Sequence, residues 1–189
     1  MKILTAILFL FLLSYVFAFS SFAQSAINTP GVPLATSDAK FINVSYDLPY
    51  PGILPDNPLY FLKALRDNLI NVFISDTIKK ANYDLLMADK RLTSADALIG
   101  KKSYQLGITT LSKSGNYFDQ AIQLTQQEKA QGADVKELLN KLYVASQKHQ
   151  QVIYLMAQKT KDRKTKFDLE LLQVRAKNFQ DTVDVIRSQ

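Results

Sequence analysis

Residues 50–63 read YPGILPDNPLYFLK, and this stretch marks the change from an extended segment to a helix. Pro51 fixes φ at the first central position of a turn, and Gly52 supplies the positive φ that a type II turn needs at the second. Pro55 keeps the preceding Leu54 out of helical space. The chain is therefore expected to reverse direction before it becomes helical.

The residues that follow are typical of a helix start. Asn57 is a favourable N-cap, and Pro58 suits the first helical position, where its missing N–H costs nothing. Asp56 adds a negative charge beside the positive end of the helix dipole. We therefore predict a helix from Pro58; a ligand-binding loop is the alternative interpretation. The complete helix-start motif is Pro51, Gly52, Leu54, Pro55, Asn57, Pro58, Leu59 and Tyr60.

Beyond this motif, apolar residues recur at steps of three and four, the spacing of one face of an α-helix. The first helix is predicted to bury Leu59, Leu62, Leu65, Leu69 and Val72. The second begins after Ser75 or Asp76, has Gly100 as its C′ residue, and buries Ile78, Ala81, Leu85, Ala88, Leu92, Ala95 and Ile99. The third ends near Gly132 and buries Tyr104, Ile108, Leu111, Gly115, Phe118 and Ile122. The fourth buries Leu138, Leu142, Ala145, His149, Val152 and Met156, and the fifth, after a polar link at residues 160–164, buries Leu169, Leu172, Ala176, Phe179, Val183 and Ile186.

This pattern predicts an all-α fold. The last four helices are each about 33–45 Å long at 1.5 Å per residue, and the short links between them make neighbours antiparallel. We expect an antiparallel long-helix bundle of four main helices plus a shorter N-terminal helix, together spanning residues 50–189. The same period also permits a coiled-coil dimer, which leaves a homo-oligomer open.

The N-terminal part has a different composition. Residues 1–23 carry Lys2, an apolar run at residues 3–19, and small residues at Ser21 and Ala23. This is the plan of a signal peptide cleaved after Ala23, and the run is also about long enough to remain as an uncleaved membrane anchor. Either outcome places the rest of the chain outside the cytoplasm, secreted or tethered to the membrane by its N-terminal segment.

Residues 24–49 form a Pro-rich linker with one exception. The segment FINVSYDL at residues 41–48 is apolar and aromatic. We expect it to lie in extended form on the helices of its own chain; a partner-binding strand is the alternative.

The composition excludes several classes of function. The formal net charge of the 189 residues is +6, too modest for a nucleic-acid binder with its basic stripe. The absence of cysteine excludes disulfides, lipoprotein anchoring, thiolate metal sites and cysteine nucleophiles. A chain with 47% hydrophobic residues has enough apolar surface for one core without a cofactor.

We find no catalytic, cofactor or metal site in the sequence and predict that the protein is not an enzyme. His149 is the only histidine, it falls on a core stripe, and Ser146 stands where a Glu-x-x-His metal motif needs glutamate. The sequence contains no nucleophile elbow and no Gly-rich phosphate loop after a strand. The aspartates Asp84, Asp89, Asp96 and Asp119 lie off the apolar stripes, where we expect solvated faces.

Two local features are candidates for contacts. A basic run comprises Lys159, Lys161, Arg163, Lys164 and Lys166. It is interpreted as a link that balances the dipole at the end of the fourth helix, with a contact to anionic lipid or wall polymer as the alternative. Gly115 indicates close helix approach; the alternative is a kink that opens a peptide-binding groove beside Tyr104 and Tyr117.

The phrases PGILPDNPLYFLKALRDNL at residues 51–69 and SDTIKKANYDLLMADKRLTSADALI at residues 75–99 resemble a bacterial family, domain of unknown function 5667. The resemblance rests on an L-P-x-x-P-L-Y-x-L-K start, a D-x-x-K-K-A helix and an R-L-x-x-A step. It is specific over residues 50–99 and fades to general helical character over residues 101–189. It implies a helical, extracytoplasmic domain of surface or membrane-linked proteins and brings no catalytic residues.

These observations together predict a non-catalytic, extracytoplasmic helical-bundle protein of the bacterial cell envelope. It is expected to act through protein or envelope contacts, without nucleic acid or a cofactor. One alternative is a periplasmic-type holdase chaperone that uses a groove between long helices. The other is a binder of anionic envelope polymer or lipid through residues 159–166.

Overall fold

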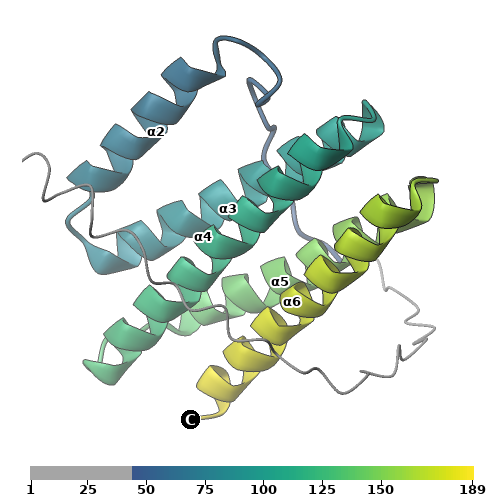
Figure 1. The fold of residues 1–189 in the computed structure, drawn as a ribbon. Coiled ribbons are helices and arrows are strands. Elements are labelled where there is room, and N and C mark those ends of the chain that lie inside the picture. The colour runs from purple at the N-terminus through teal and green to yellow at the C-terminus, as the bar shows by residue number, and fades with distance from the viewer. Residues whose placement is uncertain (1–43) are drawn as a thin grey trace, which may run out of the picture. The chain divides into compact units, whose positions relative to one another are not determined.

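A computed structural model describes residues 44–189, and all regular secondary structure within that range is helical. The helices are α2 (Tyr60–Phe73), α3 (Thr77–Gly100), α4 (Tyr104–Ala130), α5 (Lys136–Lys159) and α6 (Arg163–Ser188) (Figure 1). The prediction of an all-α fold with one short and four long helices is confirmed. The predicted leader at residues 1–23 and the linker up to residue 43 lie outside the described residues.

The four long helices form a bundle. Helix α3 packs against α4 and α5, and α6 packs against the same two helices from the other side. The turns that join α3 to α4 and α5 to α6 lie at the same end of the bundle (Figure 1). Helix α2 runs beside α3, outside the bundle (Figure 1).

The core is built from the predicted apolar stripes of the long helices. Leu85, Leu92, Leu142, Leu169 and Val183 are completely excluded from solvent. In the same core Phe118 stacks on Phe179, with the ring planes 4° apart and the centroids separated by 4.8 Å. The periodicity therefore identified correctly which faces of α3 to α6 are buried.

Two of the long helices begin at aspartate caps. The Asp76 carboxylate accepts a hydrogen bond of 2.8 Å from the Lys79 amide, so Asp76 rather than Ser75 caps α3. The Asp162 carboxylate accepts from the Thr165 amide at 2.7 Å and caps α6. In both cases the carboxylate satisfies an amide that has no partner inside the helix.

The end of α3 differs from the prediction. Gly100 belongs to the helix, and the residue with positive φ is Lys102, at 63°. The amides of Lys102 and Ser103 return to the carbonyls of Ile99 and Leu98, which makes Lys102 the C′ residue of a Schellman motif. The helix extends this far because Leu98 and Ile99 are both buried and keep their helical register.

The predicted burial of the first helix is wrong. The residues expected in its core are exposed by 51–79%: Leu59, Leu62, Leu65, Leu69 and Val72. The buried side chains of α2 are instead Lys63 and Asp67, which are 8% and 5% exposed. Helical period shows that one face is apolar, but it does not show which way that face points.

Candidate functional site

The turn before α2 is held by a buried lysine. Gly52 has φ of 69°, as the predicted turn requires. The Lys63 ammonium reaches back from α2 and donates hydrogen bonds to Pro51 O at 2.6 Å and Ile53 O at 3.2 Å. Burial lowers the pKa of Lys63, and the charge of Asp67 partly opposes that effect. These hydrogen bonds hold the face of α2 that carries Lys63 toward the rest of the molecule.

The start of α2 comes slightly later than predicted. The predicted Asn57 cap is wrong: its side-chain oxygen accepts a hydrogen bond of 2.8 Å from the Leu59 amide, but Leu59 is the residue that precedes the helix, and no side chain caps it. A short turn follows, and α2 begins at Tyr60 instead of Pro58. Asp56 forms an ion pair of 2.9 Å with Lys101 at the α3–α4 turn. The helix-start motif thus connects this end of α2 to the bundle.

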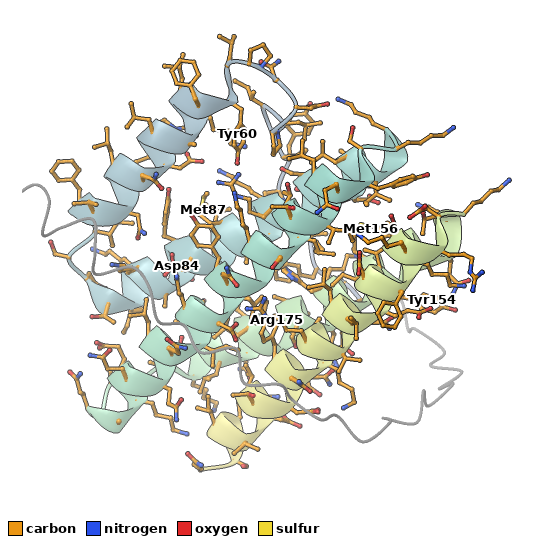
Figure 2. The ribbon with its side chains drawn as sticks, viewed as in Figure 1. Tyr60, Asp84, Met87, Tyr154, Met156 and Arg175 are labelled. Atoms are coloured by element: carbon orange, nitrogen blue, oxygen red, sulfur yellow. The ribbon has the colours of Figure 1, made fainter. Side chains whose placement is uncertain are left out.

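The side of α2 that faces α3 is polar. Tyr83 of α3 donates a hydrogen bond of 3.0 Å to the Asp67 carbonyl, and the guanidinium of Arg91 lies 5.3 Å from the centre of the Tyr60 ring. Figure 2 shows Tyr60, together with Asp84 and Met87 of α3, where the two helices face each other. Helix α2 is therefore attached to α3 through polar and cation–π contacts, with its charged side inward.

The opposite side of α2 is apolar and turned to solvent. We call it the α2 outer face and define it by Phe61, Leu62, Leu65, Leu69, Val72 and Phe73, which are 51–79% exposed. At about 100° per residue these six positions cover about a third of the helix circumference, away from Lys63 and Asp67. Because soluble monomers rarely expose a contiguous apolar patch of this kind, such a face marks an interaction site. The α2 outer face is the candidate functional site of this structure.

The edges of the α2 outer face carry little free charge. Its borders on the helix are Arg66 and Asn68, both exposed. The Arg66 guanidinium donates hydrogen bonds to Asp67 Oδ1, the shorter at 2.7 Å, so its charge is compensated locally. The face therefore suits an apolar partner rather than a strongly charged one.

The predicted basic run forms a second exposed surface. All five of its residues are exposed: Lys159, Lys161, Arg163, Lys164 and Lys166. Lys159 ends α5, whereas the three residues from Arg163 onward lie in the first turns of α6. Cations at a helix start face the positive end of its dipole, so the dipole-balancing interpretation is wrong for these three residues. The reason is that Asp162 caps α6, so this helix starts earlier than expected. The hydrogen bonds that the Asp162 carboxylate accepts from Thr165 also lower the pKa of Asp162.

An aromatic side chain accompanies this basic run. Phe167 is 55% exposed on α6, directly after Lys166, and Leu171 one turn later is exposed to the same extent. Lys164 lies 3.9 Å from Asp168, and both belong to the same helix. The end of the bundle thus combines cations with apolar groups, a combination found on surfaces that contact anionic lipid.

The single histidine belongs to a buried cluster. His149 Nε2 lies 2.8 Å from Asp89 Oδ1, and the Tyr46 hydroxyl donates a hydrogen bond of 2.6 Å to Asp89 Oδ2. Phe118 contacts the imidazole edge to face, with the centroids 4.9 Å apart. Burial, reinforced by the charge of Asp89, raises the pKa of Tyr46 far above its usual value. The Tyr46 hydroxyl, both Asp89 oxygens and His149 Nε2 have partners within the cluster, which fits a structural role.

The predicted solvated position of two aspartates is wrong. Asp84 and Asp89 are 1% and 3% exposed. Asp89 is buried because its partners come from distant segments, namely residue 46 and residue 149. The sequence signal for Tyr46 is the aromatic extended segment at residues 41–48, of which residues 41–43 lie outside the described range. The described part lies on the helices as expected: Tyr46 and Leu48 pack against the core, and the Lys148 ammonium donates a hydrogen bond of 3.1 Å to Val44 O.

No peptide-sized groove opens at Gly115, where the cavity measures only about 10 Å³. A Cβ at this position would lie 2.8 Å from Arg175 Nη1, so the close approach is made by an arginine side chain of α6. Arg175 also donates to Asn116 Oδ1 at 2.9 Å, and Figure 2 shows it crossing toward α4. Tyr104 and Tyr117 are partly buried against the core. The alternative of a peptide-binding groove at this point is therefore wrong.

An open cavity of about 510 Å³ lies beside the α4–α5 turn, and its charged lining has both signs: Lys129, Asp134, Lys136, Asp184 and Arg187. Within the described residues, His, Cys, Asp and Glu side chains do not gather in a group of three that could hold a metal ion. Over the same range, no helix has the length and apolar character needed to cross a bilayer.

Comparison with known proteins supplies the family. No curated protein and no solved structure matches the chain. A family model described as Domain of unknown function (DUF5667) matches residues 52–178. The match extends well beyond residue 99, where the sequence resemblance was expected to fade, and reaches into α6. The chain belongs to the DUF5667 family.

Proposed function

We propose that this protein is a non-catalytic module of the bacterial cell envelope, held outside the cytoplasm, that acts by docking a partner on the α2 outer face. The observation that carries the proposal is the orientation of α2, which turns Lys63 and Asp67 inward and six large apolar side chains outward. The N-terminal sequence supports the extracytoplasmic location, because both a cleaved signal peptide and a retained anchor lead there.

The energetics of the α2 outer face favour a partner. Removing one Leu, Val or Phe side chain from water is worth about 1.5–3 kcal/mol when the burial is complete. The six side chains are already partly covered, so docking recovers only a part of this for each of them. Their sum is nevertheless several kcal/mol, a favourable contribution that offsets part of the cost of association.

The proposal is tested by site-specific photo-crosslinking in intact cells. A photo-reactive residue replaces Leu65 in the full chain, and the matched control replaces Asp96, an exposed residue of α3. We expect a discrete crosslinked product from position 65 and none from position 96, in the envelope fraction. Equal labelling from both positions, no product from position 65, or recovery of the full-length chain from the cytosol would contradict the proposal.

A second candidate function is binding of anionic lipid or wall polymer through the basic run at residues 159–166. It is favoured by the exposure of all five cations beside Phe167. Each cation near an anionic surface contributes about 1 kcal/mol, and salt screens that contribution. We expect pelleting with anionic vesicles or wall material that weakens with salt and is lost when Lys161, Arg163 and Lys164 are replaced by Gln. Binding that is unchanged both by salt and by the three substitutions would contradict a lipid-binding or polymer-binding function.

The holdase alternative would have to use the α2 outer face, since no peptide-sized groove opens at Gly115. Such a chaperone suppresses aggregation of an unfolded client at ratios near one to one. Replacing Leu65 and Leu69 by Gln would abolish the suppression. A wild-type protein without any effect on client aggregation would remove the holdase function and leave specific docking unaffected.

A further inference from the structure

We infer that the partner of the α2 outer face is the same face of a second copy of this chain, with the two α2 helices paired antiparallel. This inference rests on the proposed function and names its partner. A two-fold interface brings one surface into contact with itself, so it requires a self-complementary pattern. The sequence of α2 supplies that pattern.

The apolar residues of the α2 outer face are arranged symmetrically about position 67. Residues 61–73 read FLKALRDNLINVF. Phe61 and Phe73 are equally far from Asp67, and so are Leu65 and Leu69. In an antiparallel pair centred at this level, Phe61 of one copy meets Phe73 of the other, and Leu65 meets Leu69. The pairs match aromatic with aromatic and leucine with leucine.

The size of the α2 outer face is sufficient for this pairing. Its residues are 51–79% exposed and include two phenylalanines. With aromatic side chains of about 150–250 Å² each, the face and its apolar neighbours Leu59 and Ile70 offer on the order of 700–800 Å² per copy, close to one side of a standard interface. Two helices in contact also approach to about 8–10 Å between axes, a distance that these side chains fill.

The charges around the α2 outer face favour a second copy over an anionic membrane. Helix α2 has two cations, Lys63 and Arg66. Lys63 is buried and bonded to backbone carbonyls, and Arg66 is compensated by Asp67. An anionic lipid surface would therefore gain little electrostatic attraction here. In the antiparallel pair Arg66 lies at the rim, on the border of the α2 outer face opposite Asn68, where it remains solvated.

The absence of native cysteine allows a direct test of the register. Phe61→Cys and Phe73→Cys are made singly in the full chain, which is expressed with its own N-terminal segment. Positions 61 and 73 are about 18 Å apart along one helix at 1.5 Å per residue. A disulfide needs Cα atoms within about 7 Å, so in the antiparallel pair position 61 reaches position 73 of the other copy and not its own equivalent.

The expected result is a disulfide-linked dimer when both variants are co-expressed and mildly oxidised, and at least about tenfold less product from either variant alone. Sedimentation of the wild-type protein is expected to give a dimer, Leu65→Gln a monomer, and the control Leu171→Gln on α6 a dimer. Leu65 and Leu171 are both more than half exposed, so both variants are expected to fold; helical circular dichroism checks this.

Three outcomes overturn the self-pairing. One is self-crosslinking of Phe61→Cys, which indicates a parallel pair. Another is a monomeric wild-type protein that floats with neutral phosphatidylcholine vesicles, when the Leu65→Gln variant does not float with them. In that case the proposed docking function survives, with lipid as the partner. The last is crosslinking of position 65 only to residues 1–43 of its own chain, which overturns the docking function as well.

Discussion

The hydroxyl of Tyr46 donates a 2.6 Å hydrogen bond to the buried carboxylate of Asp89, 43 residues further along the chain. The other oxygen of Asp89 lies 2.8 Å from His149 Nε2, so the extended segment, α3 and α5 meet at one carboxylate. This bond attaches the segment that precedes the helix-start motif to the centre of the bundle. It therefore fixes where the chain enters the turn that leads to α2.

Removing the hydroxyl is expected to destabilise the whole domain. Tyr46→Phe leaves the ring in place but takes one donor from a buried carboxylate, which costs about 1–3 kcal/mol. Urea unfolding followed by circular dichroism should show a lower midpoint at an unchanged slope. The matched control is Tyr50→Phe, since Tyr50 is 83% exposed. Equal effects of the two changes would contradict the role of the Asp89 bond.

Loss of the Lys63 ammonium is expected to loosen the helix-start motif before it affects the bundle. Lys63→Met keeps most of the side-chain volume but removes the donor to Pro51 O and Ile53 O. We expect faster amide exchange over the first turns of α2 and little change in α4 to α6. The control is Lys79→Met, whose side chain is 79% exposed. Unaltered exchange in α2 would show that other contacts hold the turn.

Glycine at position 102 is expected to stabilise the protein. Lys102 has φ of 63°, a conformation that costs a residue with a Cβ about 1–2 kcal/mol. Because glycine loses more entropy on folding, the net gain of Lys102→Gly is about 0.5–1 kcal/mol. The neighbouring Lys101→Gly, at φ of −79°, should have the opposite sign. Thermal unfolding of both variants measures the difference; a loss at position 102 refutes the prediction.

The sequence predicted the four long helices because each has a long stripe that only a common core satisfies. The buried Leu85, Leu142 and Leu169 are examples, one from each of three helices. Helix α2 has the same kind of apolar stripe, but two hydrogen bonds to other segments decide which way that stripe points. Lys63 of α2 donates to Pro51 O in the preceding turn, and Tyr83 of α3 donates to Asp67 O of α2. The candidate site was therefore visible in the sequence as a pattern and was assigned to the core instead of the surface.

The errors over charged residues have a similar origin. Asp89 lies off the apolar stripe of α3, and only partners from the extended segment and α5 explain its burial. The basic run was assigned to a helix end because α6 was expected to start after residue 164. The spacing of Asp162 and Thr165 was a readable capping signal, since aspartate accepts from the amide three residues later.

Asp84 is expected to make stability depend on pH. It is 1% exposed, and its Oδ1 atom has no hydrogen-bond partner within residues 44–189. Burial raises the pKa of Asp84 to about 6, and the positive charge of Lys80 opposes that rise. In the unfolded chain an aspartate titrates near its ordinary pKa of about 3.9. The folded state therefore binds more protons than the unfolded state between about pH 4 and pH 6.

It follows that the contribution of Asp84 is most favourable below about pH 4 and is lost as the pH rises through about 6. At pH 7 the buried charge costs on the order of 1–3 kcal/mol, which Asp84→Asn removes. We expect the variant to be more stable than the wild type at pH 7 and equal to it near pH 4, as measured by urea midpoints across this range. Asp96→Asn, at an exposed position of α3, is the control and should follow the wild type at every pH. A variant that is less stable at pH 7 would mean that the Asp84 carboxylate is stabilised in the folded state, because only an ionised group with favourable partners loses stability when its charge is removed.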